Sequence, residues 1–166
     1  VGGVRERRVD DRGQRDGLRG GAGVVGRRLG ELLFPNAVIA LIGPLGAGKT
    51  ALTQGIARAL GVRERVTSPT FTMVRQHHCA NTQGIDLLHH ADLYRTNSLD
   101  EIADLTLDEM VAHGGVAVVE WGEMGDALWP SSVIRLSIDS LSETDRSLTV
   151  ELDPARTLPP TMWSPA

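Results

Sequence analysis

One short segment of the chain has the residue types and the spacing that bind phosphate. It follows the pattern G-x-x-x-x-G-K-T and consists of Gly43, Pro44, Leu45, Gly46, Ala47, Gly48, Lys49 and Thr50. Glycines at this spacing let backbone N–H groups converge on phosphate oxygens, and a following helix adds its positive N-terminal dipole. Lys49 is suited to the β and γ phosphates, and the Thr50 hydroxyl to Mg²⁺. The segment therefore predicts a site for a nucleoside triphosphate with magnesium.

Three further residues are candidates to complete this site. Such a loop needs a carboxylate opposite Thr50, usually at the end of a neighbouring strand. Glu120 directly follows the apolar run 116–119, and ligands of parallel sheets bind beyond the carboxyl ends of the strands. Asp92 is a second candidate, with a simple loop or turn acid as the alternative. Thr70 lies in a polar loop where switch segments of nucleotide hydrolases usually lie, with an ordinary loop residue as its alternative.

The pattern of apolar residues predicts the elements that position these side chains. The run at 38–42 predicts a buried parallel strand leading into the phosphate loop, and residues 49–60 follow as a helix. Ser98 and Glu101 form a capping box that opens a helix to about residue 112. Further strands are expected at 71–76, 85–91, 116–119, 133–138 and 147–152, the last two as an antiparallel pair.

These elements predict one α/β domain, a single P-loop NTPase domain over residues 24–152. Its central sheet should be mainly parallel, with antiparallel edge strands near the C-terminus. Residues 1–23 are rich in Gly and Arg and predict a flexible or atypical extension, and residues 153–166 predict a loose tail. A chain of 166 residues suits one domain better than two.

Composition excludes several classes of protein. The net charge is -4, and the acids outnumber the basic residues outside the first 30 positions, so nonspecific nucleic-acid binding is disfavoured. No apolar run approaches the ~20 residues of a membrane span, and no signal-peptide core is present, which favours a cytoplasmic protein. The single cysteine, Cys79, excludes an internal disulfide, and no Cys/His cluster has zinc-site spacing. His89 and His90 are expected at the surface or behind the ligands of the site.

Lys49 is the one lysine among 17 lysines and arginines. A Ras-type GTPase reads guanine with an N-K-x-D motif, which requires a second lysine, so this class is excluded. A small-molecule kinase should have an arginine-rich lid, and the arginines after residue 60 are scattered. A small P-loop metabolite kinase therefore stays an alternative, although the sequence shows no arginine-rich lid for it. A nucleotide-dependent assembly module without essential hydrolysis is the non-enzyme alternative.

Four strings in order resemble the bacterial TsaE (YjeE) family. They are the phosphate loop, T-S-P-T-F-T at 67–72, H-A-D-L-Y-R at 90–95 and V-V-E-W at 118–121, and the similarity covers roughly residues 24–152. Members of this family are ATPases required for the threonylcarbamoyladenosine modification of tRNA. At its start the chain departs from the family, which usually opens with a strand and a Ser/Thr-containing turn, a region that helps to bind the nucleotide base.

The resemblance implies roles for individual residues. Lys49 and the loop amides would hold the phosphates of ATP, and Thr50 and Glu120 would bind Mg²⁺. Thr70 would sense the γ-phosphate, Asp92 would complete the metal site or position the attacking water, and Trp121 would pack near the nucleotide. The resemblance further implies weak hydrolysis by the chain alone. The partners it implies are the threonylcarbamoyl transferase TsaD and its partner protein TsaB, without direct binding of tRNA.

Overall fold

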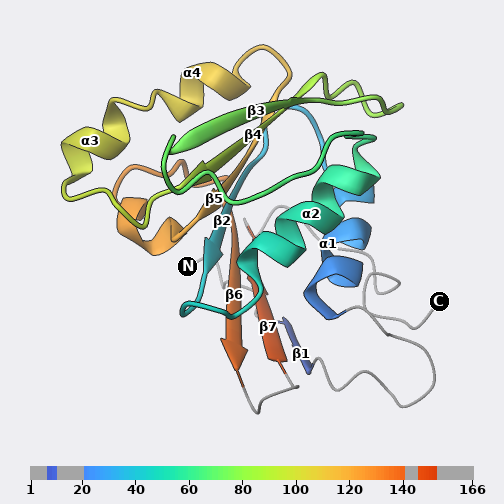
Figure 1. The fold of residues 1–166 in the computed structure, drawn as a ribbon, viewed down its shortest axis with the longest axis horizontal. Coiled ribbons are helices and arrows are strands. Elements are labelled where there is room, and N and C mark those ends of the chain that lie inside the picture. The colour runs from blue at the N-terminus through green and yellow to red at the C-terminus, as the bar shows by residue number, and fades with distance from the viewer. Residues whose placement is uncertain (1–6, 11–20, 141–145, 153–166) are drawn as a thin grey trace.

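The computed structural model describes residues 7–10, 21–140 and 146–152, with side chains from residue 21 onward. In these ranges strands and helices alternate along most of the chain (Figure 1). The elements are β1 Arg7–Asp10, α1 Gly21–Glu31, β2 Val38–Ile42, α2 Lys49–Ala59, β3 Val74–His78, β4 Leu87–Asp92, α3 Leu99–Ala103, α4 Leu107–Val111, β5 Val116–Glu120, the 3₁₀ helix η1 Gly122–Gly125, β6 Ile134–Ser140 and β7 Arg146–Glu151.

The strands form one seven-stranded sheet in the order β1-β7-β6-β2-β5-β4-β3. The central strands β6, β2, β5 and β4 run parallel. At one edge β7 and β1 pair antiparallel, as β3 does at the other. The α/β fold class, the mainly parallel centre and the antiparallel pair near the C-terminus are confirmed. The antiparallel edge at β3 arises from a hairpin with β4.

Helices cover both faces of the sheet, which explains why its central strands are continuously apolar (Figure 1). Ile39 and Leu41 of β2 lie in a buried cluster with residues of α1 and α2. Val38 and Ala40 point to the opposite face, where they pack with residues of α3 and α4. This alternation follows from the two-residue period of a strand. The loop between β2 and α2 is therefore fixed at both ends by buried elements.

Helices α1 and α2 pack so closely that glycine is required at their contact. A Cβ added to Gly26 would lie 2.1 Å from the backbone oxygen of Leu52, and one added to Gly55 would lie 2.0 Å from that of Gly23. Neither position can accept a side chain without a shift of backbone. The contact holds α2 in place, and the first turn of α2 carries Lys49 and Thr50.

The helix predicted from Ser98 to about residue 112 is wrong in its length, because the structure has two short helices there. Ser98 does cap the first of them, accepting a hydrogen bond from the Glu101 N–H at 3.2 Å. Thr106 then adopts a left-handed conformation with φ 47°, which ends any continuous helix. The break lets Ile102 and Val111 both be buried against the sheet. Among the described helices, none is long and apolar enough to cross a membrane.

Two further segments differ from the sequence-based expectation. Strand β1 and the start of α1 lie within residues 1–23, where a flexible or atypical extension is predicted and no strand or helix start is expected. β1 pairs with β7 through backbone hydrogen bonds. Backbone pairing does not require an alternation of apolar and polar side chains, so the sequence pattern gives no sign of this strand. β3 begins at Val74 instead of residue 71, because a turn with a 3.0 Å bond from the Thr72 N–H to the Pro69 carbonyl precedes it. The predicted tail at 153–166 lies outside the described residues.

Candidate functional site

The phosphate loop connects β2 to α2 and folds around its own lysine. Gly46 and Gly48 have φ values of 78° and 111°, which favour glycine. The Lys49 ammonium donates to the carbonyl oxygens of Gly43 at 2.6 Å and Pro44 at 2.9 Å. It also lies 3.8 Å from the ring centroid of Trp121. Burial lowers the pKa of Lys49 below its ordinary value, while nearby carboxylates, led by Glu120, oppose that shift. The lysine is thus held at the loop that it would serve.

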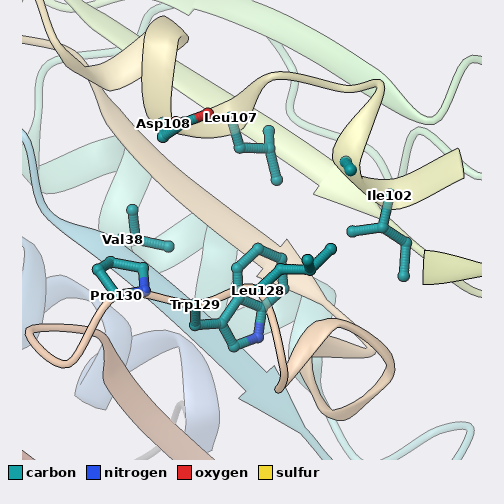
Figure 2. A pocket seen from close by; sticks show the side chains of 8 residues that line it. Val38, Ile102, Leu107, Asp108, Leu128, Trp129 and Pro130 are labelled. Atoms are coloured by element: carbon teal, nitrogen blue, oxygen red, sulfur yellow. The ribbon is translucent and has the colours of Figure 1, made fainter. Parts of the chain in front are cut away.

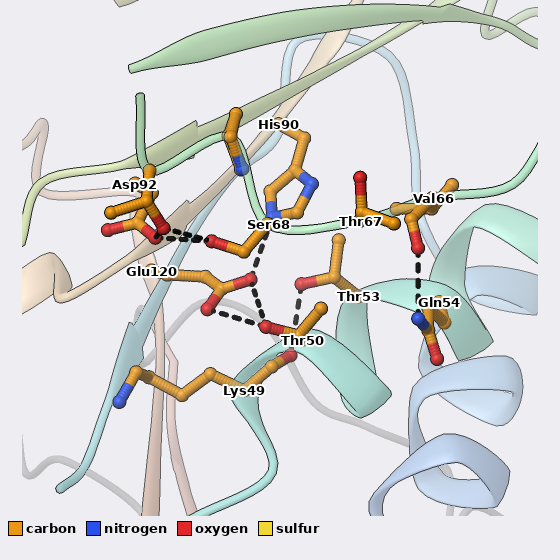
Figure 3. A network of polar contacts seen from close by, with 12 residues as sticks. Lys49, Thr50, Thr53, Gln54, Val66, Thr67, Ser68, His90, Asp92 and Glu120 are labelled. Atoms are coloured by element: carbon orange, nitrogen blue, oxygen red, sulfur yellow. Dashed lines mark hydrogen bonds and ion pairs between the residues drawn. The ribbon is translucent and has the colours of Figure 1, made fainter. Parts of the chain in front are cut away.

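Thr50 and Glu120 are in direct contact (Figure 3). The Thr50 hydroxyl lies 2.9 Å from Oε1 and 3.0 Å from Oε2 of Glu120, and donates to this carboxylate. Glu120 ends β5, and Leu41 of β2 is its neighbour in the parallel register. Only 3% of Glu120 is exposed, so its charge depends on donors within the protein. The predicted pair of metal-binding residues is therefore brought together.

Asp92 holds the loop that contains Thr70. The hydroxyl of Thr70 donates to Oδ2 of Asp92 at 2.9 Å, and the hydroxyl of Ser68 donates to the same oxygen at 2.5 Å. Oδ1 accepts from the backbone N–H of Tyr94 at 2.9 Å. Asp92 and Glu120 are register partners across β4 and β5, so both carboxylates stand at the same edge of the sheet. Asp92 is buried and is not a simple loop acid.

A cavity of about 400 Å³ lies where these groups meet. Its walls include the phosphate loop from Leu45 onward, Thr70, Asp92, Glu120 and Trp121. Of the candidate site residues, Gly43 and Pro44 do not line it. Sequence reasoning missed Ser68 and Tyr94, which line the same cavity. Ser68 belongs to the string T-S-P-T-F-T and Tyr94 to H-A-D-L-Y-R. Their closeness in sequence to Thr70 and Asp92 is the signal that could have identified them.

His90 does not lie at the surface, which is one of the two places expected for it from the sequence. The side chain is fully buried, and its Nε2 lies 2.8 Å from Oε1 of Glu120. Strand periodicity was the signal that could have placed it, because His90 is two residues before Asp92 and shares its face. The other predicted place, behind the ligands of the site, agrees with this contact.

The donor atoms at this site suit magnesium. Among the described residues, no group of three or more His, Cys, Asp and Glu side chains is placed to hold a metal ion. Magnesium does not require one, because it keeps several waters and is bound by one or two carboxylates together with substrate phosphates. The Thr50 hydroxyl and the Glu120 carboxylate are hard oxygen donors of this kind, and they touch. The residues therefore fit Mg²⁺.

His89 is buried on the face of β4 opposite to His90. Because a buried histidine titrates differently in the folded and unfolded states, it makes the stability of the fold depend on pH. Burial is the main cause that lowers its pKa, with the Met110 carbonyl opposing. A lowered pKa means that the unfolded chain binds more protons, so this histidine favours the folded state above its unfolded pKa of about 6.5 and loses that contribution as pH falls. We expect His89→Leu to flatten the decrease in unfolding free energy between pH 7.5 and 5.5.

Urea denaturation at the two pH values measures this effect. The exposed His78 offers the control, because His78→Leu should keep the pH dependence of the unmodified chain. An unchanged slope in His89→Leu would show that His89 is not a source of the acid sensitivity.

Comparison with known proteins identifies the relatives of the chain. The family described as "Threonylcarbamoyl adenosine biosynthesis protein TsaE" matches residues 22–148. The tRNA threonylcarbamoyladenosine biosynthesis protein TsaE of Treponema pallidum is 38% identical over 75% of this chain and 89% of its own length. Its counterpart from Streptomyces coelicolor is 46% identical over 69% of this chain and 76% of its own.

A solved structure agrees with the sequence matches. The crystal structure of Bacillus subtilis YdiB superposes with a TM-score of 0.66 at 25% identity, covering 92% of this chain and 88% of that one. Family match, relatives and fold are therefore consistent over most of the chain, and the residues of the family match include all the predicted site residues. The chain belongs to the TsaE family, whose named members act in tRNA threonylcarbamoyladenosine biosynthesis.

Proposed function

We propose that this chain is a Mg²⁺-dependent ATPase that acts in tRNA threonylcarbamoylation within a complex with the transferase TsaD and its partner TsaB. The contact between Thr50 and Glu120 beside Lys49 is the observation that carries the proposal. A hydroxyl at the start of the helix and a buried carboxylate on the neighbouring strand are the pair that P-loop hydrolases use for magnesium. Because its relatives are bacterial tRNA-modification proteins, the cytoplasm is the proposed place of action.

Each side chain has a distinct task in this proposal. Lys49 and the loop amides bind the phosphates, and bound Mg²⁺ supplies neutralisation of the charge that develops on them. Glu120 accepts a hydrogen bond from the Thr50 hydroxyl, which leaves the lone pairs of that oxygen available to a cation. Asp92 is the carboxylate nearest to the switch residues, so it can orient either Thr70 or a water molecule. Trp121 presents its ring to the Lys49 ammonium and packs against the Tyr94 ring.

The loop that carries Thr70 also supplies a surface for a partner. Phe71 is 84% exposed, and its ring stacks with the guanidinium of Arg95 at 4.4 Å. Leu45 is also largely exposed, and it lines the cavity. Exposed large apolar side chains close to a binding site are typical of protein contacts. Because Asp92 holds Thr70, a γ-phosphate that recruited Thr70 would move Phe71, and this couples the nucleotide to the surface.

The second large hollow does not favour the metabolite-kinase alternative. It has a volume of about 370 Å³ and is lined mainly by apolar side chains, among them Ile102, Leu107 and Trp129 (Figure 2). These residues belong to the cluster on the α3 and α4 face of the sheet, and the hollow shares no lining residue with the cavity at the phosphate loop. An acceptor for phosphoryl transfer must face the γ-phosphate, so this hollow is in the wrong place.

The test is the ATPase rate of the purified chain, alone, with the TsaD–TsaB complex, and with tRNA alone. We expect weak hydrolysis by the chain, stimulation by the complex and negligible stimulation by tRNA. Thr70→Ala should lose much of the stimulation while ATP affinity stays within about twofold, because Lys49 and the loop amides are intact. Thr72→Ala is the matched control, since Thr72 is an exposed threonine of the same loop without a bond to Asp92.

Several outcomes would contradict parts of this proposal. Phosphoryl transfer to a metabolite would favour the kinase, and full tRNA modification by a hydrolysis-dead variant would favour the assembly module. Equal stimulation of Thr70→Ala and the unmodified chain would remove Thr70 from the mechanism. If the complex does not stimulate the unmodified chain, the proposed partnership is wrong.

A further inference from the structure

The carboxylate of Glu120 has a buried imidazole behind it. His90 lies on β4, where Val118 is its register partner, and its side chain reaches toward Glu120 at the end of β5. The distance between Nε2 and Oε1 is 2.8 Å, and both side chains are nearly free of solvent contact (Figure 3). The contact involves Glu120, one of the two proposed Mg²⁺ ligands, but His90 itself is not among the residues assigned above to phosphate or metal.

The direction of this hydrogen bond follows from the chemistry of the two groups. An ionised carboxylate only accepts, so Nε2 of His90 must carry the proton and donate it. Oε1 of Glu120 then accepts from His90, and the single O–H of Thr50 lies 2.9 Å from Oε1 and 3.0 Å from Oε2, so the two oxygens share it. Hydrogen bonds from two elements fix the rotation of a carboxylate that a single donor would leave free. The carboxylate is thereby held against the Thr50 hydroxyl.

The imidazole is itself held from behind. The ring of His77 on β3 lies 6.5 Å from that of His90, tilted by 38°. His77 is buried in turn, and its Nδ1 contacts the Glu64 carboxylate at 2.5 Å. Nδ1 of His90 has no hydrogen-bond partner among the described residues, so Nε2 makes the one side-chain hydrogen bond of this ring. Packing and a single polar contact therefore direct His90 at Glu120.

The neighbouring His89 shows what a purely structural histidine looks like in this strand. It is as buried as His90, yet no side-chain hydrogen bond of the described residues reaches its ring nitrogens, and the polar group that acts on it is the Met110 carbonyl. Burial lowers its pKa, as expected for a neutral ring in the core. His90 differs in that its Nε2 has a carboxylate partner, Glu120. The two residues thus form a matched pair on opposite faces of β4.

We propose that His90 is a positioning residue that donates Nε2–H to Glu120 and so raises the affinity of the site for Mg²⁺. The inference rests on the proposed Mg²⁺-nucleotide function and extends it to a residue outside the ligand set. Groups that orient metal ligands by hydrogen bonds change metal affinity about 10- to 100-fold when they are replaced. His90 acts only through Glu120.

The experiment measures ADP binding by calorimetry in EDTA and across a Mg²⁺ titration. His90→Leu removes the donor, and we expect the Mg²⁺ concentration for half-maximal effect to rise about tenfold. Affinity in EDTA should stay within about twofold, because the phosphate contacts do not involve His90. His90→Gln, whose terminal amide can donate to Glu120, should recover most of the Mg²⁺ effect. His89→Leu should behave like the unmodified chain.

A second variant without a donor to Glu120, His90→Asn, serves as the test if His90→Leu does not fold. The amide of His90→Asn is too short to reach Glu120, so it should match His90→Leu and differ from His90→Gln. An equal loss in EDTA and in Mg²⁺ would show a merely structural role and overturn the inference. An unchanged Mg²⁺ titration in both His90→Leu and His90→Asn would also overturn the inference. If ADP binding to the unmodified chain is itself independent of Mg²⁺, the proposed magnesium function fails, a result distinct from failure of the His90 role.

Discussion

Replacing Lys49 with methionine is expected to weaken ATP binding at least tenfold. The ammonium donates to two carbonyls of its own loop, and in the proposed function it binds the β and γ phosphates. Charge-assisted hydrogen bonds of this kind contribute about 1.5–3 kcal/mol each, which is roughly 10- to 150-fold in affinity. Methionine keeps an unbranched side chain of similar length, so the substitution removes the ammonium and its hydrogen bonds while most of the packing volume is kept.

Calorimetric titration with a non-hydrolysable ATP analogue checks this prediction, and a thermal melt of the same sample checks the fold. Because Lys49 is buried and bonded within the loop, Lys49→Ala should lose more stability than Lys49→Met. Arg58→Met is the matched control, since it removes an exposed cation from the other end of α2. Unchanged affinity in a folded Lys49→Met chain would contradict the assignment of the loop to phosphate binding.

The parts of the fold that the sequence predicts well are those with a strong local signal. The buried run of β2 and the glycines of the phosphate loop constrain the backbone within a few residues, and Glu120 follows β5 directly. The antiparallel β6–β7 pair shows an alternating pattern because one set of its side chains, including Leu136 and Leu148, is buried. In these segments local pattern and tertiary environment agree.

The features that the sequence did not reveal depend on contacts between distant segments. Strand β1 owes its place to backbone pairing with β7, and no side-chain pattern records such a pairing. The break at Thr106 is set by the need to bury Ile102 and Val111 on one face, which overrides the continuous helical pattern. The position of His90 behind Glu120 requires the β4–β5 register, which a single sequence does not specify.

Glu120→Gln is expected to lower Mg²⁺-dependent ATP hydrolysis by roughly 100-fold, the upper part of the range for a perturbed metal site. The side chain keeps its shape but loses the charge that attracts the cation. The amide oxygen can take the place of Oε1 and still accept from Thr50 and His90, but the amide NH₂ then replaces Oε2 and can neither accept from Thr50 nor bind a cation. Nucleotide affinity in EDTA should change little, because Lys49 and the loop amides are untouched.

Asp92→Asn should separate catalysis from binding. One oxygen of Asp92 accepts from both Ser68 and Thr70, and the neutral amide is a weaker acceptor for two donors, so the loop is held less firmly. We expect the hydrolysis rate to fall while nucleotide affinity and its Mg²⁺ dependence are largely kept. Glu120→Gln, in contrast, should change the Mg²⁺ dependence. Rates measured in the presence of the TsaD–TsaB complex, with parallel calorimetry, compare the two variants.

Glu123→Gln is the control for both variants, because Glu123 is an exposed acid near the same end of β5 whose charge also acts on Lys49. It removes one negative charge close to the site without removing a contact with Thr50 or Thr70. A general electrostatic effect would lower hydrolysis in all three variants by similar factors, whereas specific roles require Glu123→Gln to resemble the unmodified chain. Normal hydrolysis by both Glu120→Gln and Asp92→Asn would mean that neither carboxylate serves the chemistry, and the cavity beside Thr50 would then not be the site of hydrolysis.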